Sequence, residues 1–268
     1  MDILTHALSG TAIATCVTNF CPATFLRKFK VIAVGAVGGI FPDFDAISMW
    51  SRFDTTFGKV FNLEYSGKVI SGSKFWYSHH AFFHSIFASV LFGLLLISFV
   101  YLLQILSSDR KVTFSKFCKN NNLYLVVFIL GYWAHLAGDL PTPASAWNGI
   151  DLFWPSGNYI GGYGKIWWWN NYDIFLLIMS CIIINLVIPL IFKDIRKRAG
   201  IFSACVLALT LSLILVQINN RQYDYAYSGN TSKYAEYEQN SKREQQRILG
   251  EKLYYYMAYF DGCLKFYF

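Results

Sequence analysis

The stretch IFASVLFGLLLISFVYLLQIL, residues 86–106, contains no charged side chain over its 21 positions. At about 1.5 Å per residue, a helix of this length crosses the roughly 30 Å hydrocarbon core of a bilayer. Two more uncharged runs of 19 residues follow at 174–192 and 200–218. Together, the three runs predict a helical protein embedded in a membrane.

Three further apolar segments are weaker candidates for membrane spans, because each carries ionisable side chains. With them, the sequence predicts an all-α membrane bundle of about four to six transmembrane helices. The three segments are 3–18 with His6, 31–50 with Asp43 and Asp45, and 123–140 with His135 and Asp139.

Composition excludes several other classes of protein. Of 268 residues, 55% are hydrophobic and 15% charged, against about 25% charged in an average soluble domain. This balance argues against a soluble, a disordered or a disulfide-stapled secreted protein. The net charge of +7 does not indicate a nucleic-acid partner, because the basic residues lie in short loops between apolar runs. The six cysteines form no CxxC pair, so we interpret them as small apolar side chains.

The basic residues also predict the orientation in the membrane. Alternate loops at 19–30, 107–122 and 193–199 hold 11 Lys and Arg in 35 residues, whereas the opposite set holds 12 in 118. Cytoplasmic loops carry the excess of Lys and Arg. The first set is therefore expected to be cytoplasmic, with the N-terminus and the tail outside.

Under this orientation, all five histidines fall in one layer near the outer ends of the spans. His6 lies near the start of segment 3–18, and His135 lies near the end of segment 123–140. His79, His80 and His84 immediately precede residues 86–106. Ionisable side chains inside a membrane are costly unless they are paired, hydrated or metal-bound, so this layer is a candidate functional site.

The spacing of these residues fits metal ligation. His135 and Asp139 are four positions apart, so a helix places both on one face. An imidazole nitrogen and a carboxylate oxygen are ligands that zinc accepts. Asp43 and Asp45 follow Pro42, which marks a helix end or turn. One of the two carboxylates is expected to bind metal, and the other to act as a base or to orient a histidine.

Each residue alone has a simpler interpretation. His6 can be a core histidine, His79 and His80 a solvated loop, and the pair Asp43 and Asp45 a helix cap. Their conjunction in one layer favours a metal site or a proton relay.

All eight tryptophans lie on or near the outer side, where the simplest interpretation is an interfacial belt. The alternative is an amphipathic platform at the mouth of the site, suited to a lipid. The loop 141–173 is long enough to be a lid, and Asp151 is the polar side chain that we expect it to contribute to the site.

We divide the chain into a membrane domain, 1–218, and a Tyr-rich tail, 219–268, in which 231–260 can form an amphipathic helix.

Four blocks within about the first 155 residues resemble the YdjM-like family of membrane-bound, metal-dependent hydrolases. They are MDILTHALSG, GGIFPDFDA, SHHAFFHS and GYWAHLAGDLPTP, and the later DLFWP resembles the family's L-F-W-P. The resemblance implies an inner-membrane protein whose metal ligands include His6, Asp43, His79, His84, His135 and Asp139, with Thr142 nearby.

The chain departs from the family pattern at two places. In the block H-R-G-x-T-H-S, the arginine, glycine and threonine are His80, Ala81 and Phe83. The histidine that usually follows P-D-x-D is Ala46. Either an anion-binding group is lost or His80 takes the place of the arginine, so the departures bear on the substrate more than on the metal.

The order His, Asp, His, HxxxD is also distantly similar to zinc-dependent phospholipase C and its related nucleases. That family's further histidine and HxxxE are absent, so one or two metal ions are expected rather than three. The similarity points to phosphoester chemistry in which a metal activates water.

We therefore expect a membrane-bound hydrolase that uses a divalent metal, preferably zinc, on a phosphoester or lipid-like substrate at the outer face. Asp43 and Asp45 are the expected catalytic carboxylates, and His80, Thr142 and Asp151 are expected around the ligands or on the substrate. An ion- or proton-coupled transporter would spread such residues through the membrane depth and show internal repeats. A non-catalytic protein with a structural metal would have a closed coordination shell.

Overall fold

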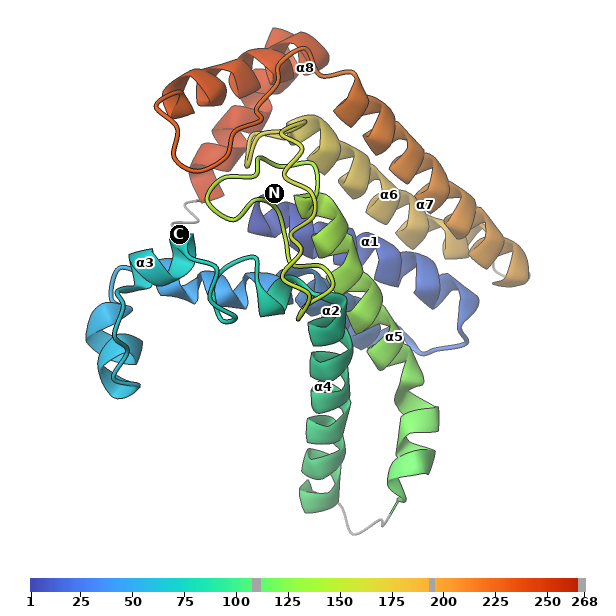
Figure 1. Cartoon of the computed structure of the whole chain (residues 1–268). Helices are drawn as coiled ribbons and strands as arrows, with labels where there is room; N and C mark the ends of the chain where they lie inside the picture. Colours follow the sequence, from blue (N-terminus) through green and yellow to red (C-terminus); the bar gives the residue numbers. More distant parts are fainter. Residues whose placement is uncertain (108–111, 193–195, 265–268) are drawn as a thin grey trace.

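The structure is a computed structural model that describes residues 1–107, 112–192 and 196–264. Within these ranges the chain is mainly helical, and pairing between extended segments is limited to isolated bridges (Figure 1). The predicted all-α membrane bundle is confirmed. The elements are α1 (Ile3–Phe20), α2 (Phe25–Ile40), η1 (Phe41–Met49), η2 (Asp54–Gly58), α3 (Gly67–Gly72), η3 (Phe82–His84), α4 (Ile86–Ser107), α5 (Phe114–Asp139), α6 (Tyr172–Ile191), α7 (Arg196–Asn219) and α8 (Tyr234–Leu264).

Four helical segments are long and apolar enough to cross a membrane, which agrees with the lower end of the predicted range. They are Phe25–Met49, Ile86–Ser107, Tyr172–Ile191 and Lys197–Asn219. The two other predicted spans also form long helices, α1 and α5. Both pack against α2, and they carry His6, His135 and Asp139.

The chain near Pro42 agrees with the prediction in part. The α-helix ends at Ile40, as expected from the proline, but Phe41 keeps helical backbone angles (φ −58°, ψ −37°). The α-helix tightens into the 3-10 helix η1, which has Pro42 in its first turn. A proline is tolerated in the first turn because its missing N–H has no helical partner there. Asp43 and Asp45 therefore sit on a continuous helical rod.

Helices α1, α2 and α5 approach so closely that their backbones touch. A Cβ built on Gly39 would overlap the carbonyl oxygen of His6, and one on Gly35 would lie 2.6 Å from the Cβ of Ala14. Small residues at such a spacing let helices pack at short range in a membrane. This packing brings the start of α1 together with the ends of α2 and α5.

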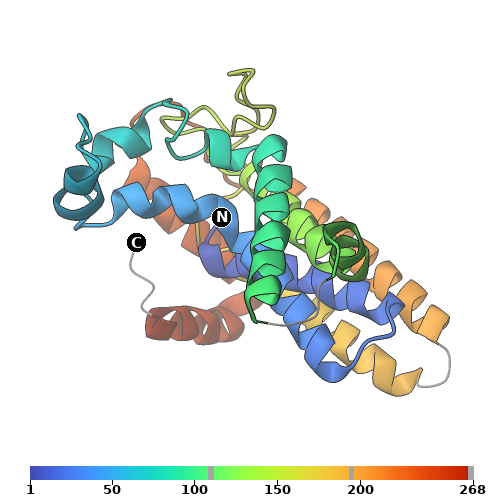
Figure 2. The same ribbon diagram turned by 90° about the horizontal axis from the view of Figure 1, so that it is seen from below.

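The remaining helices cover this centre from two sides. α1 lies between α2 and the pair α6–α7, and α4 packs along α5 (Figures 1 and 2). Inside the apolar bundle, Asn19 Nδ2 donates to the carbonyl of Asn185 and to Ser203 Oγ, both at 2.7 Å. This amide joins α1 to α6 and α7 at buried positions.

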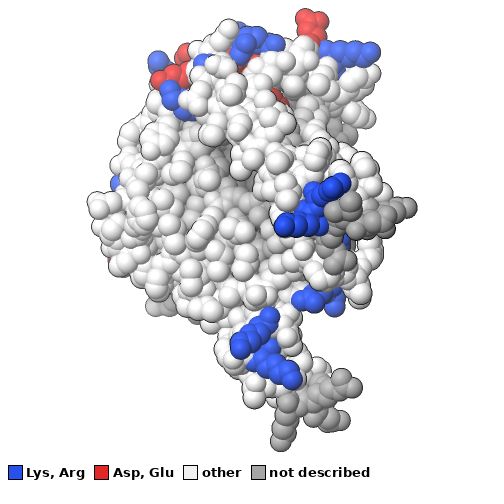
Figure 3. Space-filling view, turned by 90° about the vertical axis from the view of Figure 1, so that its right-hand side faces the viewer, with Lys and Arg blue, Asp and Glu red and all other residues white. Residues whose placement is uncertain are grey.

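Charged side chains concentrate at the two ends of the molecule. In Figure 3 a broad uncharged surface separates an upper end with both signs of charge from a lower end where only blue Lys and Arg are seen. The uncharged surface matches the exposed apolar side chains of α4, α6 and α7. The exposed basic residues away from α8 include Arg27, Lys30, Lys116, Lys119, Lys197 and Arg198.

The tail forms the predicted helix, which runs from Tyr234 to Leu264 and bends at Gly250 (φ 73°). Its first half is fixed by buried polar contacts with the start of α6. Gln245 donates to Asp173 Oδ1 and accepts from the Asp173 N–H, each at 3.0 Å. Arg221 pairs with the same carboxylate at 2.9 Å. The tail thus docks onto the membrane helices, while the predicted domain boundary at 218/219 stays a prediction.

Candidate metal centre

All five histidines and three aspartates gather where α1, α2, η1, α5 and the segment before α4 meet. We call this group the His/Asp cluster. Adjacent imidazole rings lie 3.7–5.2 Å apart between centroids. The cluster consists of His6, Asp43, Asp45, His79, His80, His84, His135 and Asp139.

His135 is held by a backbone carbonyl at the end of α2. Its Nδ1 lies 2.8 Å from the carbonyl oxygen of Gly39. A carbonyl only accepts hydrogen bonds, so Nδ1 carries the proton. In the neutral ring, Nε2 therefore presents its lone pair to the middle of the cluster.

His84 is held in the same way by a carboxylate. Asp45 Oδ2 accepts from His84 Nδ1 at 3.1 Å, and Asp45 Oδ1 accepts from His79 Nδ1 at 2.6 Å. Asp45 is buried, and these two contacts use both of its oxygens. In neutral rings, the Nε2 atoms of His79 and His84 remain available to accept a proton or bind a metal ion.

Asp139 divides its two oxygens between different partners. Oδ1 accepts from His6 Nε2 at 3.1 Å and from the amino group of Met1 at 2.9 Å. Oδ2 is buried and forms no hydrogen bond with the described residues. It lies 3.0 Å from His135 Nε2 and 3.5 Å from His84 Nε2. A buried carboxylate oxygen without a partner is costly, so this atom suggests a cation ligand.

Three atoms thus converge: His84 Nε2, His135 Nε2 and Asp139 Oδ2. The two nitrogens are 3.3 Å apart, so the three separations span 3.0–3.5 Å. In a tetrahedral zinc site with bonds of about 2.0–2.1 Å, ligand atoms are about 3.3–3.4 Å apart. The three atoms therefore fit one face of such a tetrahedron.

Asp43 lies on the fourth side of this arrangement. Its Oδ1 is 3.6 Å from His135 Nε2 and 3.8 Å from His84 Nε2. Its side chain is 18% exposed, whereas those of His84 and His135 are fully buried and that of Asp139 is 3% exposed. Asp43 is therefore the carboxylate of this set that faces open space.

His6 reaches the cluster from the first turn of α1. It is fully buried, and its ring stacks on that of His135 with centroids 3.7 Å apart. The turn is fixed by Asp2, whose side chain caps the helix by accepting from the N–H of Thr5 at 2.9 Å. Sequence reasoning missed this role of Asp2, although an aspartate three residues before Thr5 is a typical N-cap pattern.

His80 occupies a conformation that its neighbours impose. Its φ of 67° is left-handed, and its Nδ1 lies 3.1 Å from the carbonyl of Gly149. The ring packs against Trp147 at 4.4 Å. Burial, together with His79 and His84, lowers the pKa of His80 well below its ordinary value. A neutral His80 does not supply the positive charge of the family's arginine.

Three overlapping groups in the described part of the chain could each hold a metal ion. The groups are His6–His135–Asp139, Asp43–His84–His135 and His79–His80–His84. The electrostatics favour a cation here. Burial alone would lower the pKa of His84, but Asp45 and Asp139 raise it to about 10. The roles of the individual residues as ligands stay predictions.

Thr142 and Asp151 support the cluster from outside. Thr142 Oγ1 donates to the carbonyl of Asp139 at 2.6 Å, at the end of α5. The N–H of Asp151 donates to the carbonyl of His80 at 2.9 Å. Both contacts position the backbone that carries cluster residues. The contacts seen within the cluster do not include the Asp151 carboxylate.

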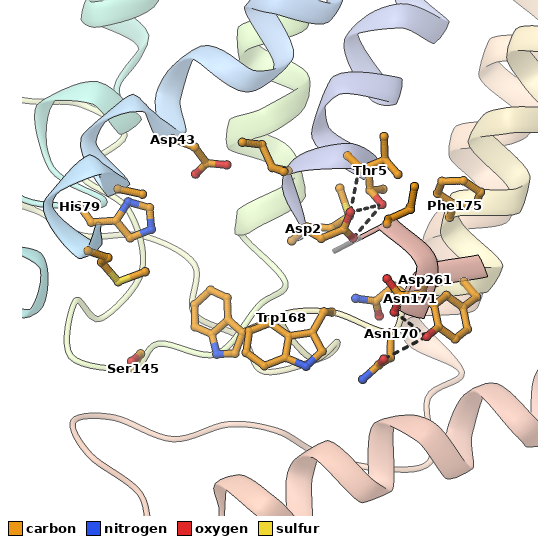
Figure 4. A pocket seen from close by; sticks show the side chains of 18 of the residues that line it. Asp2, Thr5, Asp43, His79, Ser145, Trp168, Asn170, Asn171, Phe175 and Asp261 are labelled. Atoms are coloured by element: carbon orange, nitrogen blue, oxygen red, sulfur yellow. Dashed lines mark hydrogen bonds between the residues drawn. The ribbon is translucent and has the colours of Figure 1, made fainter. Parts of the chain in front are cut away.

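A cavity of about 580 Å³ opens from the cluster. Asp43 and His79 lie at one end, as Figure 4 shows, and Phe175 and Asp261 lie at the other. Trp168 lines the wall between the two ends. Three of the eight tryptophans expected at the outer side, Trp147, Trp168 and Trp169, therefore line the cavity, while others such as Trp76 are exposed.

Comparison with known proteins gives one family. A family model described as YdjM inner membrane protein matches residues 1–221. The match includes every residue of the His/Asp cluster and ends before α8 begins. No curated protein and no solved structure gives a significant match.

Proposed function

The chain belongs to the YdjM inner membrane protein family, and on that premise we propose that it is a membrane-bound, metal-dependent hydrolase of a phosphoester or lipid-like substrate. One observation carries the proposal. The lone-pair atoms of His84 and His135 and an unpaired carboxylate oxygen of Asp139 converge at 3.0–3.5 Å beside a cavity. With both rings neutral, three acceptors so close together repel one another unless a proton or a metal ion lies between them.

We assign His84, His135 and Asp139 as the ligands of one divalent ion, preferably zinc. The remaining cluster residues hold these ligands in place. Asp45 fixes His84 and His79, and His6 fixes Asp139. Partners of this kind set the ring orientation and raise the basicity of metal-binding histidines.

Asp43 is the proposed general base. It borders both the ligand atoms and the cavity, so a water molecule in the cavity can donate a proton to its carboxylate. A divalent ion at this site would supply Lewis-acid activation of water and of a phosphoryl or carbonyl oxygen. Three buried ligands and an accessible fourth side favour catalysis over a purely structural ion, whose coordination shell would be closed.

The test is metal analysis of the purified full-length protein. Asp139→Asn should remove the bound metal, because the amide is a weaker ligand and cannot replace the anionic oxygen. Asp43→Asn should keep the metal but lower the turnover of phosphodiester and lipid ester substrates by about 10²-fold or more. Asp224→Asn is the matched control, since Asp224 is exposed in the segment before α8.

Two results would contradict the assignment. Full metal content in Asp139→Asn would remove this residue from the ligand set. Unchanged turnover in Asp43→Asn would reject the role of Asp43 as the base. Metal binding without turnover of any ester by the wild type would instead support a structural ion.

A further inference from the structure

The cavity beside the cluster has a second end that the proposed chemistry does not use. There, α6 contributes Phe175, and the second half of α8 contributes Met257, Phe260 and Leu264. The rings of Phe175 and Phe260 lie 6.2 Å apart. The total volume of about 580 Å³ is within the range of about 300–1,000 Å³ typical of ligand pockets. This end can take an apolar group.

The charges around the cavity limit what else can bind. Among the described residues, the lining contains no Lys or Arg, and its carboxylates are Asp2, Asp43 and Asp261. Its basic groups, the amino terminus at Met1 and the ring of His79, already pair with Asp139 and Asp45. A ligand with several negative charges would meet three carboxylates with no Lys or Arg to offset them. The lining therefore favours a ligand with one small polar group at the cluster and an uncharged remainder.

The second half of α8 has the character of a helix at a membrane interface. After the bend at Gly250, the side chains of Tyr255, Tyr256 and Tyr259 are 56–67% exposed, whereas Met257 is buried. Tyrosines are enriched where one side of a helix meets the interface. The inner side of this helix is thus a cavity wall, and its outer side suits contact with headgroups.

This half-helix is attached to the end of a membrane span. Tyr172, at the start of α6, donates from its hydroxyl to Asp261 Oδ2 at 2.8 Å. Phe175 follows one turn later on α6. The apolar end of the cavity therefore lies at the boundary of the apolar bundle, where the alkyl chain of a membrane lipid can reach it.

We propose that this end of the cavity binds one alkyl chain of a membrane amphiphile, with the chain between Phe175 and Met257 and its ester beside Asp43. The inference rests on the proposed hydrolase function and names its substrate class, a lipid with a single polar head at the cluster. The family match ends at residue 221, so the α8 side of this site lies outside the matched region, whereas Phe175 lies within it.

Photo-crosslinking tests the site without relying on turnover. The full-length protein is placed in vesicles of phosphatidylethanolamine and phosphatidylglycerol that contain a phospholipid with a diazirine in its acyl chain. After irradiation, labelled residues are mapped by mass spectrometry, and metal content is measured on the same sample. We expect label on Phe175 and Met257, as well as on lipid-facing Leu190, which is 65% exposed on the same helix as Phe175.

Variants at one position separate the cavity from the outer surface. Met257→Trp fills the apolar end and should lower the label on Phe175 at least about fivefold, with the label on Leu190 unchanged. Met257→Phe is a second variant in case the tryptophan impairs folding. It adds less volume to the cavity, so it should lower the label on Phe175 by a smaller factor. Tyr256→Trp is the matched control, because this neighbour is 56% exposed and points away from the cavity.

Failure of this inference and failure of the proposed function give different results. Label restricted to exposed residues, or an unchanged label on Phe175 in both Met257 variants, overturns the chain site whatever the metal content. A cavity label that responds to Met257 supports the chain site even if no ester is turned over. In that case the proposed hydrolysis is the part that fails.

Discussion

At the scale of single residues, His84 and His135 differ in what fixes them. His84 depends on the carboxylate of Asp45, whereas His135 depends on the backbone carbonyl of Gly39. A side chain can be replaced without moving the backbone. The two proposed ligands should therefore respond differently to mutation, with His84 the more easily disturbed.

Asp45→Asn should weaken metal binding without abolishing it. The amide has one accepting oxygen, so it can hold His84 or His79 but not both. Loss of such an orienting partner typically costs about 10–100-fold in metal affinity. Competition with a chromophoric chelator measures this change, with Asp224→Asn as the control. Unaltered affinity would mean that Asp45 does not orient His84.

The sequence predicts which residues form the cluster better than it predicts which of their atoms contact one another. The HxxxD spacing places His135 and Asp139 on one helix face, and the structure agrees. The carbonyl of Gly39 as the partner of His135 cannot be predicted, because every residue has a carbonyl and only tertiary packing selects one. The division of Asp139 between His6 and the cluster centre depends on the same packing.

At the scale of elements, the contact between α1 and α2 depends on a missing side chain. Gly39→Ala should lower the free energy of unfolding by about 1–3 kcal/mol, the typical cost of overpacking. Its Cβ would overlap the carbonyl of His6, and neither backbone can move freely. Thermal unfolding in detergent measures the loss.

Gly72→Ala is the matched control for this prediction. A Cβ on Gly72 meets no atom within 4 Å, so the unfolding temperature should change little. Equal effects of the two substitutions would show that close packing at Gly39 is not what stabilises the bundle.

The docking of α8 should depend on pH through Glu238. Burial raises the pKa of this carboxyl, but hydrogen bonds from Lys242, Asn170, Trp167 and Trp169 outweigh burial and lower the pKa below its ordinary value of 4.5. Ionised Glu238 therefore stabilises docking above about pH 4.5, and this contribution is lost as the pH falls through the lower folded-state pKa.

Hydrogen exchange measures this pH dependence. Protection factors of residues 234–249 should fall on acidification from about pH 6 to pH 3 in the wild type. In Glu238→Gln they should be lower at pH 6 and depend less on pH. Glu236→Gln, at an exposed position on the same helix, should behave like the wild type. A wild-type pH profile in Glu238→Gln would assign the titration to another group.

Among the elements, the periodic spacing of apolar residues predicts that a helix exists more reliably than it predicts where the helix begins and ends. The tail helix predicted over 231–260 is found at 234–264, and the segment predicted at 123–140 is the last part of α5, which starts at Phe114. The polar start of α5 gives no hydropathy signal. The contacts of Glu238 with the tryptophans of a distant loop leave no local pattern either, because they join residues about 70 positions apart.

At the scale of the whole molecule, the separation of charge predicts the orientation in the membrane. The lower end in Figure 3 shows Lys and Arg without Asp or Glu, whereas the upper end shows both signs of charge. By the excess of basic residues on the cytoplasmic side, we expect the cluster and α8 to face outward. A membrane-impermeant maleimide should label exposed Cys263 of α8 in cells whose inner membrane is intact.

The converse labelling is the control for orientation. In a variant without other accessible cysteines, Lys119→Cys at the basic end should be labelled only after the inner membrane is permeabilised. Labelling of Lys119→Cys but not of Cys263 in intact cells would reverse the orientation. The cluster would then remain in one layer but face the cytoplasm.

The cluster draws its members from segments that leave the ribosome at different times, from His6 to Asp139. Its carboxylates lie at helix ends and not in the middle of the uncharged spans, and Asp43 also borders the cavity. During synthesis, Asp43 and Asp45 can therefore remain hydrated at the membrane surface until α5 is inserted. The chain can thus assemble a buried charged centre without carrying an unpaired carboxylate across the bilayer core.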